Sequence, residues 1–380
     1  MLKIAERGFS IVLSAVLCFG FLFVDCKALK TSARAMVLIN ADTLEILDFK
    51  NHNEKLPMAS TTKLMTALII AENCNLEKKI VTTAEMVTVE GSSMGLLEGD
   101  RVSYYSLLVG MMLPSGNDAA NTAAISYAGS VSKFAEIMNE KAKEIGMENS
   151  HFVTPSGLHD DEHYSTAFDM ALLASEVLKN ETLREIVACE KKTVSFGNPP
   201  YKRTLYNHNK LLSKHEFAIG LKTGYTKKAG RCLVSAAMKD GCSVVAVTLD
   251  APDDWNDHEK LLNYGLSVLT PKSINADVSG ISIPIVGAIN KTLSVEAPEI
   301  VIGHTQNSVD ITYKIYHQPF LYAPVLKEQT VGFIEYYCNG RILKTLPLKA
   351  KENIEAKEIK PKSEISKWLF NVYLLIVSCL

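Results

Sequence analysis

Two kinds of hydrophobic periodicity follow one another along the chain. Apolar and polar residues alternate in "AMVLINADTLEILDFKN" around an Asp42-Thr43 turn, which predicts a β-hairpin. Apolar residues then recur at helical spacing over 58–72 and again from Leu107 to about Met147. Residues 231–249 resemble two strands joined by a turn, and "WNDHEKLLNYGLSVL" predicts a closing helix. Strands at both ends with helices between them favour an α/β (α+β) domain in which helices pack on an antiparallel sheet.

The pattern changes after about Pro271. Helical periodicity gives way to short alternating runs such as "VDITYKIY", and Asn339-Gly340 lies between two β-rich runs, which predicts a type I′ hairpin. We therefore expect a first domain over 29–268 and a small all-β domain over 272–355. A length of 380 residues agrees with two domains. The second domain carries no visible cluster of chemically active residues.

The N-terminus has the pattern of a targeting segment. Two basic residues precede an uncharged run over 9–24, and the small residues Cys26 and Ala28 suit a cleavage site. Residues 1–28 are therefore predicted to be a secretory signal peptide, so the bulk of the chain is exported. The alternatives are an uncleaved N-terminal anchor and a lipoprotein attached at Cys26, where Asp25 replaces the small residue that such a site prefers.

The C-terminus, residues 356–380, combines a charged linker with the apolar tail "WLFNVYLLIVSCL". As a helix this tail would span about 20 Å, which is short of the roughly 30 Å hydrocarbon core of a bilayer. We expect an interfacial or partly inserted anchor with Lys367 and Trp368 at the water boundary. A tail folded onto the protein's own surface is the alternative.

Composition narrows the possible partners. Lys and Arg total 40 against 42 Asp and Glu, so no basic surplus suggests a nucleic-acid partner. The six cysteines after the signal segment show no close paired spacing, which predicts free thiols and no disulfide framework. No pattern of metal ligands is visible, so we expect neither a metal nor another cofactor.

The stretch "MASTTKLMTALII" is apolar except in its first turn, where it carries three hydroxyls and an ammonium. Ser60 and Lys63 are three residues apart and so share one face of the predicted helix. A partly dry lysine beside a serine can lose its proton and act as the general base for a serine nucleophile. This S-x-x-K pattern is weak alone, because Ser130 and Lys133 repeat it and a capping serine with a snorkelling lysine would also explain it.

Two further patterns follow in order. Ser115-Gly116-Asn117 lies at a break between apolar segments, and Lys222-Thr223-Gly224 precedes a strand-like run. S-x-x-K opening an apolar helix, then S-x-N, then K-T-G is the combined signature of penicillin-binding proteins and class A β-lactamases. The ordered set therefore points to a serine acyl-enzyme chemistry.

The resemblance extends beyond these patterns. Together with "GSSMGLLEGD", "TPSGLHDDEHYSTAFDMALLA" and "GLKTGYTKKAGRCLVSAA", the chain resembles the D-alanyl-D-alanine carboxypeptidases, low-molecular-mass penicillin-binding proteins of the S11 serine peptidase family, over roughly residues 34–265. The resemblance implies a penicillin-binding/β-lactamase-like fold. It also implies that the protein is located in the cell envelope, at the outer face of the cytoplasmic membrane. It also implies peptidoglycan stem peptides with D-Ala-D-Ala termini as substrate and β-lactam antibiotics as covalent inhibitors. The β-rich segment 272–355 resembles the family's second domain more loosely.

The resemblance also implies catalytic roles for three residues. Ser60 would attack the carbonyl of the penultimate D-alanine and form an acyl-enzyme, and Lys63 would be its base. Ser115 would relay a proton to the departing D-alanine.

Five more residues would bind substrate in this family. Asn117 would bond the substrate backbone, Lys222 would supply positive charge, and Thr223 would bond the terminal carboxylate. Gly224 would let substrate lie against the strand without a side chain in the way. The backbone N–H groups of Tyr225 and of the nucleophile would form the oxyanion hole.

The chain departs from the family at two positions. Some members carry arginines where this chain has His208 and Trp255, and both would favour a substrate carboxylate. The departure bears on substrate affinity and leaves the nucleophile untouched. His208 is interpreted as a surface or packing residue.

Three other functions compete with the carboxypeptidase. A class A β-lactamase needs an E-x-x-L-N loop between the second and third patterns, whereas Glu259-Lys-Leu-Leu-Asn263 lies after them in a helical segment. An endopeptidase that cuts peptidoglycan cross-links would use the same residues. A non-catalytic wall-binding homologue would be expected to have lost some of them.

Overall fold

The computed structural model describes residues 29–305, 310–357 and 368. These divide into two compact units, each with its own contacts. The first contains the described residues up to Ile39, then Ile46–Ala237 and Val245–Tyr264; the second contains Asn40–Glu45, Met238–Val244 and the described residues from Gly265 onward. Two short segments that interrupt the first unit, Asn40–Glu45 and Met238–Val244, thus belong to the second unit. Neither unit is therefore one continuous stretch of sequence. The boundaries 29–268 and 272–355 stay a prediction.

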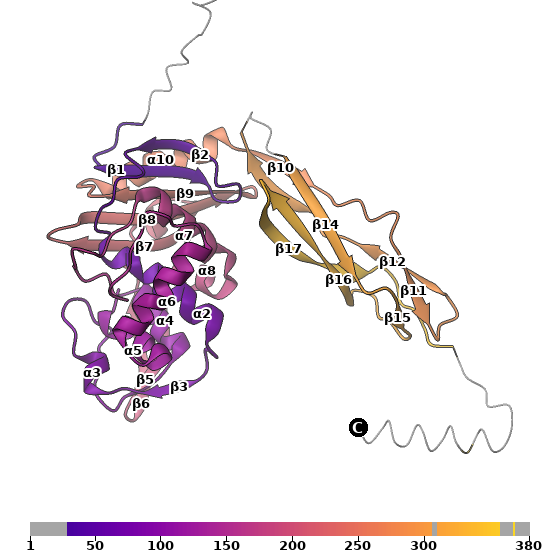
Figure 1. Cartoon of the computed structure of the whole chain (residues 1–380), viewed down its shortest axis with the longest axis horizontal. Coiled ribbons are helices and arrows are strands. Elements are labelled where there is room, and N and C mark those ends of the chain that lie inside the picture. Colours follow the sequence, from indigo (N-terminus) through magenta and orange to yellow (C-terminus); the bar gives the residue numbers. More distant parts are fainter. Residues whose placement is uncertain (1–28, 306–309, 358–367, 369–380) are drawn as a thin grey trace, which may run out of the picture. The chain divides into compact units, whose positions relative to one another are not determined.

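A five-stranded sheet organises the first unit (Figure 1). Its order is β2 (Ile46–Lys50), β1 (Ala35–Asn40), β9 (Cys242–Leu249), β8 (Gly230–Lys239) and β7 (Ala218–Thr226). β1 pairs antiparallel with β2, which confirms the predicted first hairpin. The two strands predicted within residues 231–249 are β8 and β9, and β8 also pairs antiparallel with β7. β8 turns into β9 through Asp240 and Gly241, which both have positive φ, as a type I′ turn requires.

Helices fill the sequence between the two halves of this sheet. The predicted helix at 58–72 begins as a 3-10 turn, η1 (Ala59–Thr62), and continues as α2 (Lys63–Asn73), whose first eight residues are all buried. A helix that is apolar on every side belongs inside a core, which accounts for this burial. The helical region predicted from Leu107 onward is three helices, α4 (Tyr104–Met112), α5 (Asn117–Ala128) and α6 (Val131–Glu144).

Further helices of this unit are α3 (Ala84–Val87), α7 (Ala167–Lys179), α8 (Glu181–Val187) and α9 (Leu211–Lys214). The predicted closing helix is confirmed as α10 (Asp254–Val268). Its buried His258 contacts Ser235 on β8, and its Nε2 lies 2.9 Å from Thr248 Oγ1 on β9. The imidazole therefore fastens α10 to two strands, and burial lowers its pKa to about 3, which keeps it neutral.

A second, four-stranded sheet has the order β3 (Lys79–Val81), β4 (Arg101–Ser103), β5 (Lys191–Gly197) and β6 (Pro200–Tyr206). The β5–β6 hairpin carries Arg203, whose guanidinium lies over the rings of Phe196 and Tyr201 and donates to Gly95 O at 2.7 Å. This sheet therefore supports the segment around residue 95, which borders the site described below.

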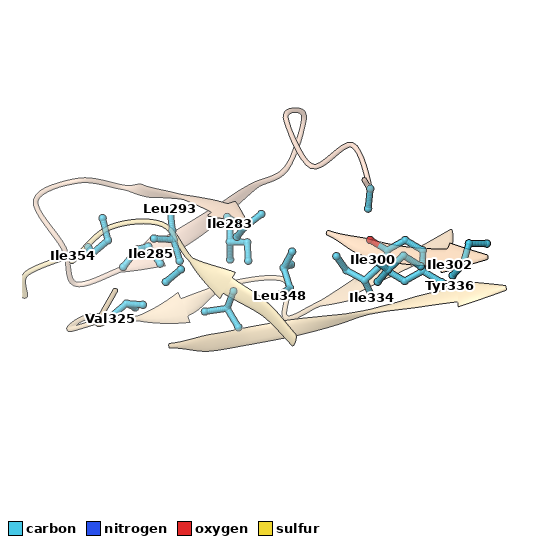
Figure 2. Close-up of a cluster of buried hydrophobic side chains, with 14 residues drawn as sticks. Ile283, Ile285, Leu293, Ile300, Ile302, Val325, Ile334, Tyr336, Leu348 and Ile354 are labelled. Carbon is cyan, nitrogen blue, oxygen red and sulfur yellow. The ribbon is translucent and has the colours of Figure 1, made fainter. Parts of the chain in front are cut away.

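The second unit is built from strands. A six-stranded sheet has the order β14 (Ile311–His317), β16 (Thr330–Cys338), β17 (Arg341–Ala350), β12 (Thr292–Glu296), β11 (Ser282–Val286) and β15 (Leu321–Tyr322), and β10 (Thr270–Ile274) pairs with β13 (Ile300–His304). Alternate residues point inward, such as Ile283 and Ile285, and form a hydrophobic cluster with Leu293, Ile334 and Leu348 (Figure 2).

The predicted hairpin of this unit joins β16 to β17. Both Asn339 and Gly340 have positive φ, at 50° and 78°, so the type I′ prediction is confirmed. The signal peptide predicted for 1–28 and the membrane-associating tail lie outside the described residues, apart from Trp368 and the first residues of the linker. Within the described part of the chain, no helix combines the length and apolar character needed to cross a membrane. The five cysteines described there, Cys74, Cys189, Cys232, Cys242 and Cys338, are free thiols.

Candidate active site

The polar first turn seen in the sequence forms a strained turn at the base of a cleft. Ala59 has a φ of 49°, in the left-handed region that non-glycine residues rarely adopt. Thr61 Oγ1 donates to Met58 O at 2.6 Å and Thr62 Oγ1 donates to Ala59 O at 2.8 Å. These two threonines stabilise the turn by donating to its carbonyl groups. Of the three hydroxyl residues in the turn, Ser60 is the one that lines the cleft.

Lys63 lies beneath Ser60 and is completely buried. Its Nζ is 2.9 Å from Ser60 Oγ and donates to Asn117 Oδ1 and to Ser156 O, both at 2.7 Å. Burial lowers the pKa of Lys63 well below its ordinary value, the charge of Lys222 lowers it further, and Asp118 opposes both effects. The site therefore favours the neutral amine over the charged ammonium, in the direction a general base needs.

The partners of Lys63 fix the direction of its hydrogen bonds. A neutral amine has two N–H groups and one lone pair, and a carbonyl oxygen can only accept. The oxygens of Asn117 and Ser156 thus take both N–H groups. The lone pair is left for the Ser60 hydroxyl, which is the geometry of a general base beside its nucleophile.

The S-x-N segment also borders the cleft, through Ser115. Ser115 has a φ of 63° and is nearly buried, and α5 begins two residues later at Asn117. Asn117 Nδ2 donates to Glu90 O at 2.6 Å, which turns its Oδ1 toward Lys63, and its backbone N donates to Ser92 O at 2.7 Å. The amide thus links the base to the segment around residue 92.

The K-T-G residues lie on β7, beside the nucleophile turn. Lys222 is almost fully buried, and its Nζ donates to Thr223 O at 2.9 Å. Burial lowers the pKa of Lys222 to about 7. Around neutral pH this lysine therefore exchanges its proton, and while charged it disfavours a second charge on Lys63.

The structure gives a further reason for glycine at position 224, beside the one expected from the resemblance. A Cβ at this position would lie 3.0 Å from Met58 O, 3.0 Å from Ser60 N and 3.1 Å from Thr61 N. The missing side chain therefore leaves room for the nucleophile turn. The flanking residues Thr223 and Tyr225 face the cleft.

The cleft has a volume of about 350 Å³. It brings together Ser60, Ser115, Thr223, Gly224 and Tyr225, five of the eight predicted site residues, while Lys63, Asn117 and Lys222 lie behind its surface. Its lining also includes residues that the sequence patterns did not reveal: Ser92, Lys210, Arg231 and Asp254.

The two positions where the chain departs from the family pattern, His208 and Trp255, also line the cleft. The interpretation of His208 as a mere surface or packing residue is therefore incomplete, since it is both exposed and part of this lining. Partial desolvation of its ring by the cleft wall lowers its pKa, with a contribution from the charge of Lys222.

A loop over 154–158 closes the site from behind. Ser156 supplies the carbonyl that holds Lys63, and Gly157 packs against the nucleophile turn at a φ of 80°. His163 anchors the loop, because its Nδ1 accepts from Val153 N at 2.9 Å and its Nε2 lies 2.8 Å from Thr62 Oγ1. Burial lowers the pKa of His163 to about 4, so this anchor is neutral. The partner of Lys63 in this loop is the backbone carbonyl of Ser156, which any residue could supply. It could therefore be found from the sequence only through the loop's similarity to the family.

Comparison with known proteins identifies the family. The family model described as "D-alanyl-D-alanine carboxypeptidase" matches residues 24–253. The chain belongs to this family. A second family model, "Penicillin-binding protein 5, C-terminal domain", matches residues 292–356 in the β-rich unit.

Relatives in this carboxypeptidase family match over most of their length. The chain is 31% identical to the D-alanyl-D-alanine carboxypeptidase DacF of Bacillus subtilis, covering 85% of this chain and 86% of the relative. It is 32% identical to DacC of Escherichia coli, covering 87% and 86%. The crystal structure of DacD from Francisella tularensis superposes with a TM-score of 0.61 at 27% identity, covering 87% of this chain and 95% of that one.

Proposed function

We propose that the protein is a serine-type D-alanyl-D-alanine carboxypeptidase that removes the terminal D-alanine from peptidoglycan stem pentapeptides. One observation carries the proposal. The Nζ of buried Lys63 lies 2.9 Å from Ser60 Oγ and 2.7 Å from two carbonyl oxygens, so the neutral amine would give both N–H groups to these oxygens and keep its lone pair for Ser60. Membership of the carboxypeptidase family supplies the substrate class.

The first half of the reaction is acylation. Lys63 takes the proton of Ser60 as the oxygen attacks the carbonyl carbon of the penultimate D-alanine. The carbonyl oxygen becomes an oxyanion, which the backbone N–H groups of Ser60 and Tyr225 would stabilise. Support comes from Gly224, whose Cβ position is 3.0 Å from Ser60 N, since only glycine lets β7 bring both amides to one place. One such donor is typically worth about 100- to 1000-fold in rate.

Collapse of the tetrahedral intermediate releases D-alanine. The C–N bond breaks, and Ser115 relays the proton from Lys63 to the leaving amine. Thr223 would bond the terminal carboxylate, Lys222 would supply positive charge from behind it, and Asn117 would bond the peptide backbone. Water then attacks the acyl-enzyme, with Lys63 again as base, and restores the Ser60 hydroxyl. Penicillins would acylate the same oxygen through their ring carbonyl, whose leaving nitrogen stays tethered and delays release.

Location and domain roles are part of the proposal. The chain would be exported through its segment 1–28 and would act in the cell envelope at the outer face of the cytoplasmic membrane. The tail would attach it to the membrane surface. The catalytic domain would occupy 29–268 and the small β domain 272–355.

Replacing the nucleophile tests the proposal. We expect Ser60→Ala to abolish labelling by a fluorescent penicillin and release of D-alanine from a stem pentapeptide, measured by mass spectrometry. Ser130→Ala is the matched control, because Ser130 opens the chain's other S-x-x-K and only caps α6, accepting from Lys133 N at 3.2 Å. Its loss costs about 1 kcal/mol of stability and leaves labelling intact. Full labelling of Ser60→Ala would refute the assignment. Labelling of the wild type without D-alanine release would move the substrate to cross-linked peptides.

A further inference from the structure

Arg231 is held rigidly at the edge of the cleft. Its Nε and Nη2 donate to Asp254 Oδ1 at 3.0 and 2.8 Å, and its guanidinium carbon lies 5.8 Å from the centre of the Trp255 ring. The Asp254 side chain is 4% exposed, whereas that of Arg231 is 41% exposed. The aspartate thus occupies one edge of the guanidinium, and the other N–H groups stay accessible.

Strand pairing places Arg231 on the same face of the sheet as Thr223. Arg231 on β8 lies directly opposite Tyr225 on β7, and Leu233 lies opposite Thr223. Directly opposed residues and residues two apart share one face of a sheet, so Thr223 and Arg231 are diagonal neighbours on the same face. Such a diagonal is within reach of a long side chain, and both residues line the same cleft.

The other cations near Ser60 are less suited to hold a constant charge. Lys63 is neutral in its role as base, and burial gives Lys222 a pKa of about 7. Among the described residues that line the cleft, Lys210 is the other cation, and its side chain is a mobile point charge on the exposed surface. A guanidinium stays charged at any physiological pH and binds a carboxylate through two parallel hydrogen bonds.

We propose that Arg231 is a specificity-determining residue that binds the free terminal carboxylate of the substrate together with Thr223. This rests on the proposed carboxypeptidase function. Arg231 would take the place of the arginine that some family members carry at the position of Trp255, whose indole ring centre lies 5.8 Å from the guanidinium carbon. Asp254 fixes its orientation and so reduces the entropy lost on binding.

The test compares two substrates on the same protein preparation. One is a stem pentapeptide ending in free D-alanine, and the other is the same peptide ending in D-alaninamide. Release of D-alanine or D-alaninamide is followed by mass spectrometry to obtain kcat/KM for each. The acid-to-amide ratio does not depend on the fraction of folded enzyme, so a variant that folds incompletely still gives a valid result.

We expect the wild type to prefer the acid and Arg231→Gln to lower this ratio about 10- to 100-fold, the range of a hydrogen-bonded charge pair. Arg231→Lys should recover part of the preference for the acid, since lysine keeps the positive charge but cannot form two parallel hydrogen bonds to a carboxylate. Arg184→Gln on α8 is the control, because Arg184 is outside the cleft lining and donates to Leu178 O. Its ratio should match the wild type.

Two results would overturn the inference: an unchanged acid-to-amide ratio in Arg231→Gln, or a wild type that cleaves both peptides equally well. Failure of the proposed function is distinguishable from both. In that case the wild type releases neither product, whatever residue occupies position 231.

Discussion

Gly157 tests whether the loop behind the site positions the nucleophile. A Cβ at this glycine would lie 1.9 Å from Ala59 O and 2.5 Å from Ala59 C. The first separation is about 1.5 Å less than the 3.4 Å at which ordinary contact begins, so either the loop or the nucleophile turn must move in Gly157→Ala. Neither partner is the flexible end of a side chain, because both are backbone.

The consequence follows from the adjacent hydrogen bond. Ser156, the residue before Gly157, accepts from Lys63 Nζ at 2.7 Å. A displacement of about 1 Å would stretch this bond beyond hydrogen-bonding distance and turn the lone pair of Lys63 away from Ser60. Misplacement on this scale costs about 100-fold in rate. We therefore expect the second-order rate constant for acylation by a fluorescent penicillin to fall by about that factor or more.

Gly129→Ala is the matched control. Gly129 ends α5 with a φ of 85°, close to the 80° of Gly157, but a Cβ there meets nothing within 4 Å. Both variants pay the penalty of about 1–2 kcal/mol for a left-handed alanine, seen as a lower melting temperature. Only Gly157→Ala should also lose acylation. Wild-type acylation in Gly157→Ala, or equal losses in both variants, would show that the loop does not position the base.

Two further predictions concern the charges around the site. Because the pKa of Lys222 is lowered to about 7, this lysine is protonated below that pH and neutral above it. We therefore expect kcat/KM to fall as pH rises through about 7. A pH profile of kcat/KM that is flat from about pH 6 to about pH 9 would contradict this. Asp118 accepts from Ser93 Oγ at 2.6 Å and from the N–H groups of Met94 and Leu96 at 2.9 and 3.0 Å. Asp118→Asn should therefore lower the free energy of unfolding by about 2 kcal/mol or more, measured with urea. It should also lower the pKa of Lys63 further, shifting the acid limb of the pH profile downward, and an unchanged stability would refute the role of this carboxylate.

The sequence predicted the elements and the three motifs well because both depend on local pattern. The hairpin at 339–340 follows from Asn-Gly, and the buried helix α2 follows from its continuous apolar run. Ser60 and Lys63 were found because one helical turn brings them together wherever the helix lies. These features require no knowledge of the distant chain.

The features that sequence could not reveal depend on pairings across long separations. Ser156 holds Lys63 through a backbone carbonyl that any residue could supply, 93 positions along the chain. Arg231 reaches the cleft only because β8 pairs with β7 in one register and α10 brings Asp254 beside it. The need for glycine at position 224 has the same origin, because the atoms that exclude a side chain belong to the turn at 58–61.

The two buried lysines explain why these long-range pairings matter for chemistry. Burial lowers the pKa of both lysines, so burial does not decide which one is the base. Neighbours decide it: the two carbonyl oxygens around Lys63 leave its lone pair for Ser60, whereas Lys222 donates to Thr223 O on its own strand. A proton on Lys222 then disfavours one on Lys63, so below about pH 7, where Lys222 is charged, the neutral form of Lys63 is favoured further. The charged lysine suits an anionic substrate and the neutral one suits proton transfer, so both functions depend on the register that brings β7 against the nucleophile turn.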